Sequence, residues 1–526
     1  MNRRTAGLAG AALAIAVVTV VARAAGFGRT LVFARTVGFD CLGSTYQTAN
    51  TVPNIVFEVV AGGALATLVV PLIAGAVSRG DTHEASSTTS ALLTWALTLL
   101  VPAGLLVAVL ARPIISVLIG TPPGGCDRTA VIDVGSRMLQ VFAPQVPLYG
   151  VGLVLAGVAQ AHRRFLGPAV APLLSSVVVI GAYLSYAAAG RAGSLQGLDR
   201  GRELVLSVGT TAGVVVLALS LLLPLRGTGL RLRPRWRFGP GVGSTARTLA
   251  LAGVATLVAQ QLAVAVGLRL ANDRGPVGAV ALFALASTVF LLPWAVLAVP
   301  LATSAFPRSA AAHAGGDSAE WGRITGVTAR AVLLGCSASA AVLVVVAQPL
   351  SRVVAEGAPG RADVRALAYA VALLAPGLLG YGLVAHLGRA LAARGDARAA
   401  ATATCIGWLT VVIVDVVLVP AVAQRWVIVA LAVGNSVGMS VAGVLLARRA
   451  GAALSGLAPQ AVRAVGVAVL TVAVVWPSVR AWGDRDVPVS LVQVVVGGAL
   501  AIGFFAAALM LLDKRGIAEL RTGLRG

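Results

Sequence analysis

The chain has 526 residues, of which 58% are hydrophobic and only 11% are charged, and its mean hydropathy is +0.92. Soluble globular proteins carry about 25% charged residues, so this composition excludes an ordinary soluble domain. The net charge of +22 comes from arginines that lie mostly between apolar stretches, which favours a role in membrane topology over nucleic-acid binding.

About fourteen apolar stretches of roughly 20–30 residues follow one another, and each is long enough to cross a bilayer as a helix. Backbone groups in lipid must be satisfied within the segment, so helices are expected. The predicted ranges are 6–34, 45–77, 88–110, 129–160, 167–189, 203–225, 244–271, 277–306, 324–347, 364–393, 399–421, 426–447, 460–479 and 488–511. The sequence therefore predicts an all-α, polytopic membrane protein with about 14 transmembrane helices.

The loops differ in basic charge when they are counted alternately from an inside N-terminus. The inside loops contain Arg79, Arg163, Arg164, Arg226, Arg231, Arg233, Arg235, Arg237, Arg308, Arg323, Arg394, Arg398, Arg448 and Arg449, and the tail adds Lys514, Arg515, Arg521 and Arg525. The outside loops hold fewer, among them Arg112, Arg191, Arg274, Arg361 and Arg485. By the positive-inside rule, both termini are predicted to be cytoplasmic.

Two halves of the chain resemble each other. The pattern Ala-Pro followed by Tyr-Gly occurs from Ala143 and again, with the same internal spacing, from Ala375. A second match, a proline followed by an aspartate at the same distance, occurs at Pro71 with Asp81 and again at Pro307 with Asp317, and its offset along the chain is nearly equal. These repeats predict two six-helix lobes followed by two C-terminal helices, an organisation typical of transporters with a substrate site between lobes that rock.

Four parts of the chain are predicted on this basis. They are an N-lobe with helices 1–6 (1–225), a basic cytoplasmic linker (226–243), a C-lobe with helices 7–12 (244–447), and helices 13–14 with a cytoplasmic tail (448–526). The linker contains the densest basic cluster of the chain, and we expect it to lie on the anionic inner leaflet with Trp236 at the headgroup level.

The first apolar segment contains Arg23 and Arg29, with Arg35 at its end. Arginine at membrane depth is costly, which indicates function, and guanidinium binds phosphate oxygens in a bidentate manner. On a straight helix Arg23 and Arg29 point about 120° apart, so a bend at Gly26 is expected to turn both inward. The alternative is that Arg29 and Arg35 extend to the outer interface.

The second segment contains Asn50, Pro53, Asn54 and Glu58. Pro53 is expected to open or kink the helix, which frees backbone groups beside a cavity. The two asparagines and the glutamate are candidate substrate-binding residues. Glu58 also suits an ion pair with an arginine of the first segment, and that pair could be structural.

Asp415 is a lone acid in the apolar run from Val411 to Val417. A site for Na⁺ or H⁺ is one interpretation, and a buried ion pair with an arginine such as Arg269 is the other. No motif for nucleotide binding, metal binding or nucleophilic catalysis occurs, so no enzyme activity, no cofactor and no ATP are expected.

Cys41 and Cys126 both fall in loops assigned to the outside. An oxidising exterior permits a disulfide between them, although the sequence does not supply the required geometry.

The stretch from Arg23 to Pro71 carries a motif set that resembles the MurJ (MviN) family of lipid II flippases, within the multidrug/oligosaccharidyl-lipid/polysaccharide exporter superfamily. The matching residues are Arg23, Gly26, Phe27 and Arg29, then Ala49-Asn50-Thr51-Val52-Pro53-Asn54, Gly63-Ala64 and Val70-Pro71. The stretch from Leu292 to Pro307 looks like the family's eighth helix, and the resemblance extends over nearly the whole chain in length and segment number.

The resemblance implies a fourteen-helix fold with a central cationic cavity, and a groove from the last two helices for a polyprenyl tail. It implies that Arg23 and Arg29 hold the diphosphate of lipid II, and that Asp415 matches an acid of a sodium site in some members. The implied function is translocation of this cell-wall precursor across a bacterial plasma membrane for peptidoglycan synthesis and cell shape, with cell-wall synthesis proteins as further candidate partners.

The chain departs from the family pattern where members usually carry charges. These positions are Thr30, Ser44, Gly62 and Ser287-Thr288. The departures motivate two alternatives to a lipid II flippase: an exporter of another lipid-linked glycan or a drug, and a non-transporting scaffold for cell-wall enzymes.

Overall fold

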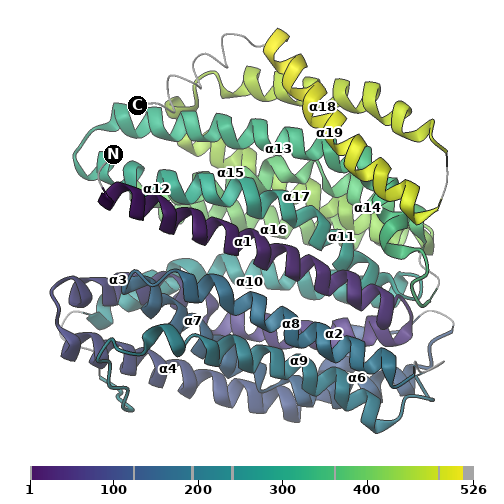
Figure 1. The fold of residues 1–526 in the computed structure, drawn as a ribbon, viewed down its shortest axis with the longest axis horizontal. Helices are drawn as coiled ribbons and strands as arrows, with labels where there is room; N and C mark the ends of the chain where they lie inside the picture. The colour runs from purple at the N-terminus through teal and green to yellow at the C-terminus, as the bar shows by residue number, and fades with distance from the viewer. Residues whose placement is uncertain are drawn as a thin grey trace. The chain divides into compact units, whose positions relative to one another are not determined.

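The computed structural model describes residues 3–122, 125–190, 195–237, 242–360, 363–483 and 486–512. These residues form helices joined by short turns, with no strand among them, so the predicted all-α class is confirmed (Figure 1). Residues 238–241 of the predicted linker and 513–526 of the predicted tail lie outside the described residues.

The chain divides into two compact units, Met1–Asp273 and Arg274–Gly526. The first unit contains α1 (Arg3–Thr36), α2 (Cys41–Phe57), η1 (Glu58–Gly62), α3 (Gly63–Ser78), α4 (Thr82–Val109), α5 (Ala111–Ile119), α6 (Arg128–Phe142), α7 (Gln145–Ala161), α8 (Leu166–Ala188), α9 (Arg200–Ser220), η2 (Leu223–Leu225) and nearly all of α10 (Val242–Arg274). The second contains α11 (Ala279–Pro293), η3 (Trp294–Ala298), α12 (Val299–Ala314), α13 (Ser318–Ala355), α14 (Val364–Leu374), α15 (Gly377–Ala393), α16 (Ala397–Leu418), η4 (Val419–Ala421), η5 (Gln424–Trp426), α17 (Val427–Ala450), η6 (Gly451–Leu454), α18 (Leu457–Arg480) and α19 (Val487–Leu512).

Each of the fourteen predicted ranges overlaps helix in the structure. Within the described residues, twelve helices are long and apolar enough to cross a membrane, and the pair α14 and α15, bent by 42°, makes up to thirteen. The remaining predicted segment, 45–77, is helical as α2, η1 and α3. The chain is therefore a multi-span membrane protein.

Aspartates begin many of these helices. The side chains of Asp40, Asp81, Asp127, Asp199, Asp317 and Asp363 accept backbone N–H bonds at the starts of α2, α4, α6, α9, α13 and α14. A carboxylate at this position satisfies an otherwise unpaired donor and complements the helix dipole. Much of the small acidic content of the chain thus marks where its helices start.

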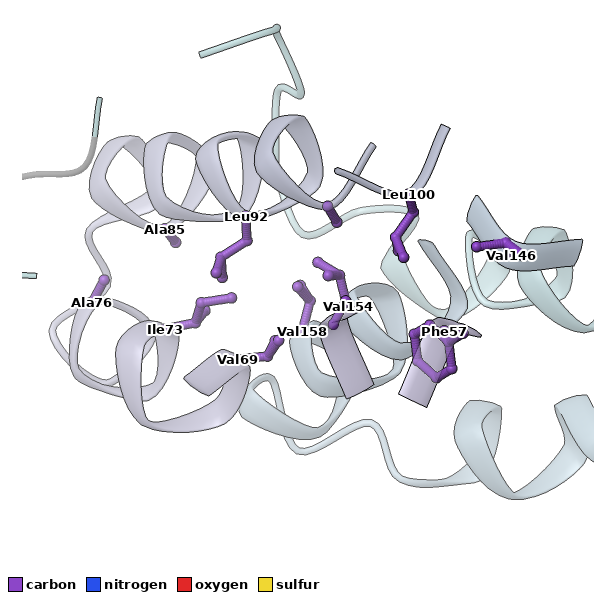
Figure 2. Packing of buried hydrophobic residues seen from close by; sticks show 12 residues of the cluster. Phe57, Val69, Ile73, Ala76, Ala85, Leu92, Leu100, Val146, Val154 and Val158 are labelled. Atoms are coloured by element: carbon purple, nitrogen blue, oxygen red, sulfur yellow. The ribbon is translucent and has the colours of Figure 1, made fainter. Parts of the chain in front are cut away.

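A buried apolar cluster joins α2, α3, α4 and α7 within the first unit. Figure 2 shows Ile73 of α3, Leu92 of α4 and Val158 of α7 pointing toward one another. All three are at most 2% exposed. In the second unit, α18 and α19 pack against α13, as Figure 1 shows in yellow and green.

The structure shows the internal repeat at more positions than the sequence pattern does. A π-helical turn interrupts the second predicted segment at Glu58–Gly62, and another interrupts the eighth at Trp294–Ala298. The offset between these two turns equals that between Pro71 and Pro307. The Ala-Pro pairs at 143–144 and 375–376 lie at the junctions of α6 with α7 and of α14 with α15. Both π turns and both junctions therefore recur at the spacings seen in the sequence.

Helix α10 groups with the first unit, whereas the sequence analysis places it in the C-lobe. Its C-terminal end explains this grouping. The Asn272 amide donates to the Thr48 hydroxyl at 3.0 Å and to the Leu118 carbonyl at 3.2 Å. The Asp273 carboxylate accepts from the Thr121 N–H at 2.8 Å.

One local expectation is wrong. Helix α1 runs through Gly26 and Gly28 without a break, so no break there turns Arg23 and Arg29 to one side. Helix α2 contains Pro53 in its interior and is followed directly by the π turn η1, and a kink at Pro53 stays a prediction. A proline removes one hydrogen bond, and the neighbouring turns absorb this loss in a packed membrane helix.

A disulfide joins Cys41, at the start of α2, to Cys126, before α6. We expect the double variant Cys41→Ser, Cys126→Ser to lose about 2 kcal/mol of stability, toward the low end of measured disulfide effects. The loss is modest because the membrane already restricts the unfolded chain. Thermal unfolding in detergent measures it, and an unchanged midpoint would show that the bridge contributes nothing. The double variant Cys336→Ser, Cys405→Ser, at the two cysteines outside this disulfide, is the control.

Candidate functional site

Arg29 is half-buried on α1, and its charge acts on the hydroxyl groups of Tyr46, Tyr149 and Tyr183. These tyrosines come from α2, α7 and α8. Helix α1 packs along α8, which brings Arg29 toward them. Arg29 therefore lies near enough to these tyrosines for an electrostatic interaction, and the alternative that places it at the outer interface stays open.

The tyrosine cluster is held by its own hydrogen bonds. The Tyr46 hydroxyl lies 2.9 Å from that of Tyr183 and 2.6 Å from the Thr210 hydroxyl. The ring of Phe33 packs on both tyrosines, with centroids 5.4 and 5.5 Å away. Buried hydroxyls that bond one another form a rigid wall beside Arg29.

The other predicted arginines lie differently. Arg23 and Arg35 are both exposed on α1. Neither Arg23 nor Arg29 has an ion-pair partner among the residues whose side chains the structure describes. The structure thus brings only Arg29 into the tyrosine cluster, and the roles of Arg23 and Arg35 stay predictions.

Helix α2 and η1 carry the remaining predicted site residues of the first unit. The Asn50 side-chain oxygen is buried and has no hydrogen-bond partner among the described residues, whereas Asn54 is exposed. Glu58 begins η1 and is half-buried. The expected ion pair of Glu58 with Arg23 or Arg29 is wrong, since no such pair forms in the described part of the chain.

The Glu58 carboxylate lies over Gly62, in the space that a side chain at residue 62 would occupy. The two residues are four positions apart and so lie on the same helical face, where their side chains are neighbours. A carboxylate therefore occupies the neighbourhood of position 62 although that residue is glycine.

A second polar network lies next to the first. The Tyr149 hydroxyl donates to the Gln145 side chain at 3.2 Å, and the Gln145 amide donates to the Thr211 hydroxyl at 3.1 Å. Gln145 is fully buried. The network links α7 to α9 and fixes the position of Tyr149.

Glu203 is a buried acid that the sequence analysis missed. Its side chain is 1% exposed and forms ion pairs with Arg137 at 2.6 Å and Arg200 at 2.7 Å. Two cationic partners compensate the cost of burying the carboxylate. This cluster joins α6 to α9, and because the carboxylate is already paired twice, we assign it a structural role.

Asp415 of α16 is 3% exposed in the second unit, and one of its carboxylate oxygens has no hydrogen-bond partner among the described residues. Arg269, offered as an example of an arginine partner, bonds Asp273 on its own helix at 2.9 Å, and the pairing of Asp415 with an arginine stays a prediction. The Asp415 carboxylate faces Gly434. The side-chain oxygen of the next residue, Asn435, is also buried and has no hydrogen-bond partner in the described part of the chain. A buried carboxylate oxygen without a donor is suited to a proton or a small cation.

Small residues let α17 approach Asp415. Gly434, Gly438 and Ala442 follow at four-residue spacing on α17, opposite Gly407 of α16. A Cβ at Gly438 would lie 2.5 Å from the Gly407 carbonyl oxygen, and one at Gly434 would overlap the Asp415 carboxylate. Close packing at small residues is a common helix contact in membranes.

The tyrosines are the main functional residues that sequence reasoning missed. Only six of the 526 residues are tyrosine, and four of them lie in α2, α7 and α8. Their rarity in apolar segments is the signal that could have found them. The described residues contain no group of three or more His, Cys, Asp or Glu suited to a metal.

The first unit therefore presents one half-buried guanidinium beside tyrosine hydroxyls, a chemistry that suits a phosphate or diphosphate. The second unit presents a buried carboxylate oxygen without a hydrogen-bond donor among the described residues, which suits a small cation.

A family model described as "Lipid II flippase MurJ" matches residues 33–497. A probable lipid II flippase MurJ of Rhizobium tropici is 25% identical over 425 residues, which cover 79% of this chain and 76% of the relative. The lipid II flippase MurJ of Burkholderia cenocepacia is 25% identical over 65% of this chain and 64% of its own length.

Solved structures share the fold. A lipid II flippase MurJ in an inward closed conformation matches with a TM-score of 0.73 and 16% identity, covering 94% of this chain and 98% of that one. An inward-facing multidrug resistance transporter of the MATE family matches with a TM-score of 0.66 and 14% identity, covering 84% and 96%.

Proposed function

Because the chain belongs to the MurJ family of lipid II flippases, we propose that it translocates lipid II from the inner to the outer leaflet of a bacterial plasma membrane. The family match over residues 33–497 carries this proposal. Lipid II is a polyprenyl-diphosphate-linked saccharide, and its movement supplies peptidoglycan synthesis. The family is one of transporters rather than catalysts.

Arg29 is the residue that best suits the diphosphate, with Arg23 as its partner on α1. The tyrosine hydroxyls beside Arg29 are further hydrogen-bond groups for phosphate or sugar oxygens. Asn50 supports the same role through its unpaired buried oxygen, which a donor of the saccharide would satisfy. Asn54, Glu58 and Arg35 are proposed to contact the cargo more peripherally.

The carboxylate of Glu58 also bears on the departures from the family pattern. The carboxylate lies where a side chain at position 62 would be. The negative charge of Glu58 therefore takes the place of the acid that the family pattern has at position 62. This supports retention of transport over the scaffold alternative. The Thr30, Ser44 and Ser287-Thr288 departures still favour testing a second cargo, another polyprenyl-linked glycan.

The deciding experiment measures lipid II on the outer face of cells depleted of their own flippase and expressing this chain. Restored exposure supports the proposal. If the chain is present in the membrane and exposure is not restored, while another lipid-linked glycan appears outside, the alternative cargo is correct.

For the cycle, we propose that both termini are cytoplasmic and that one lobe rocks against the other, so that the cargo headgroup crosses while its tail stays in lipid. The arginine-rich loops support this orientation. Cysteine accessibility from each side tests it. A cysteine introduced at Arg79 or Arg448 should be labelled only from the cytoplasm.

We further propose that Asp415 binds the coupling cation, Na⁺ or H⁺. If Na⁺ binds the folded protein, a concentration ten times the dissociation constant should stabilise it by about 1.4 kcal/mol. Asp415→Asn should abolish this shift in thermal unfolding, whereas Asp133→Asn, at an outlying ion pair, should keep it. A wild-type protein indifferent to Na⁺ would exclude sodium and favour the proton.

A further inference from the structure

Residues 229–237, here called the strap, follow α9 and lie along α4. Their backbone N–H groups donate to hydroxyls of that helix: Arg231 to Ser86 at 3.1 Å, Arg233 to Ser90 at 3.1 Å and Arg235 to Thr94 at 2.9 Å. The N–H of every second strap residue thus bonds the hydroxyl of every fourth residue of α4. The match is geometric, since two extended residues span about 6.6 Å and four helical residues span about 6 Å.

Two of these hydroxyls, those of Ser86 and Thr94, both donate and accept a hydrogen bond. Ser86 donates to the Thr82 carbonyl at 2.6 Å and Thr94 donates to the Ser90 carbonyl at 2.8 Å, while each accepts a strap N–H. At the end of the strap, the Trp95 indole donates to the Trp236 carbonyl at 3.0 Å, and the two rings meet edge to face. The strap is therefore held at fixed positions on α4.

Alternation in an extended segment places the side chains of Arg231, Arg233 and Arg235 on one face, and those of Leu232 and Trp236 on the other. The arginines and α4 enclose a pocket of about 670 Å³. Its lining residues are Thr82, His83, Ser86, Ser87, Ser90, Gly229, Arg231, Arg233, Pro234 and Arg235, and none of them is acidic. Glu84, the acid nearest on α4, is bonded to Arg79 at 2.6 Å.

The pocket lies where the surface of α4 changes character. Before Trp95 the helix carries hydroxyls, and beyond it the outward residues are apolar. They include Leu97, Leu99, Leu105, Leu106 and Val109, which are 40% to 78% exposed. Trp95 and Trp236, 40% and 56% exposed, mark the boundary. Exposed tryptophans at such a boundary are typical of the membrane interface.

From these observations we infer that the strap and α4 form a binding site for the headgroup of an acidic phospholipid of the inner leaflet. The three arginines bind the phosphate, the α4 hydroxyls line the pocket, and Leu232 and Trp236 contact the acyl region. This site is separate from Arg29 and does not depend on the identity of the transported cargo. Basic pockets at a membrane surface recognise anionic headgroups in this way.

To test this, the purified full-length chain is incubated with an equal mixture of dioleoyl phosphatidylglycerol and dioleoyl phosphatidylcholine. Native mass spectrometry then measures how many molecules of each lipid stay bound. We expect roughly tenfold preference for phosphatidylglycerol, since the arginines are exposed and each contributes only part of a full headgroup contact. The triple variant Arg231→Gln, Arg233→Gln, Arg235→Gln should lose it. The equal charge loss in Arg226→Gln, Arg448→Gln, Arg449→Gln should not.

A second variant separates a built pocket from general surface charge. Ser86→Ala, Ser90→Ala, Thr94→Val removes the hydroxyls that hold the strap and keeps every arginine. The preference should also be lost in this variant. Retained preference in either strap variant overturns the inference, and so does displacement of the lipid by equimolar inorganic phosphate, which would indicate a site for small anions.

Discussion

Arg29→Ala is expected to reduce lipid II exposure at least about tenfold, because a charge-assisted bond to phosphate is worth about 1.5–3 kcal/mol. Arg29 is half-buried and interacts electrostatically with Tyr46 and Tyr183, whereas Arg23 and Arg35 are exposed. Arg29→Lys should recover part of the activity, since lysine keeps the charge but loses the bidentate geometry. The measurement is outer-leaflet lipid II in flippase-depleted cells.

Arg112→Ala is the matched control for this variant. Arg112 forms an exposed ion pair with Asp133 at 2.7 Å, and its loss should leave lipid II exposure unchanged. Equal amounts of each variant in the membrane must be shown by immunoblotting. Full activity of Arg29→Ala at wild-type levels would rule out the diphosphate role and favour a cargo without a diphosphate.

Gly438→Ala is expected to destabilise the second unit by about 3 kcal/mol, the upper part of the range for overpacked cores. The added methyl group would lie 2.5 Å from the Gly407 carbonyl oxygen and would also overlap Val411. Backbone cannot rotate away as a side chain can, so α16 and α17 must separate. Because Asp415 lies in the same contact, stabilisation by a bound cation should weaken as well.

Thermal unfolding in detergent, with and without Na⁺, measures both effects. Gly466→Ala on α18 is the control, since a methyl group there meets no atom within 4 Å. It should be neutral or slightly stabilising, because alanine favours helix more than glycine does. A midpoint for Gly438→Ala equal to that of Gly466→Ala would contradict the close packing described for α16 and α17.

Much of this protein follows from the sequence alone. The length and spacing of apolar stretches determine the helices, because a bilayer leaves the backbone no alternative to internal hydrogen bonding. The repeated Ala-Pro and Pro-to-Asp patterns of the two halves predicted a duplication that the paired junctions and π turns then display. The first-helix and Pro-Asn motifs indicated the family that the match over residues 33–497 confirmed.

The side-chain partners were decided only by the tertiary structure. Glu58 was expected to suit a pair with an arginine of the first helix, yet its carboxylate lies over Gly62. Arg29 interacts electrostatically with tyrosines from three other helices, and the strap N–H groups bond hydroxyls that are distant in sequence. Hydropathy specifies which segments enter the membrane, but in segments apolar on every face it does not specify which faces meet. That choice depends on close packing between helices, which periodicity in a single chain does not encode.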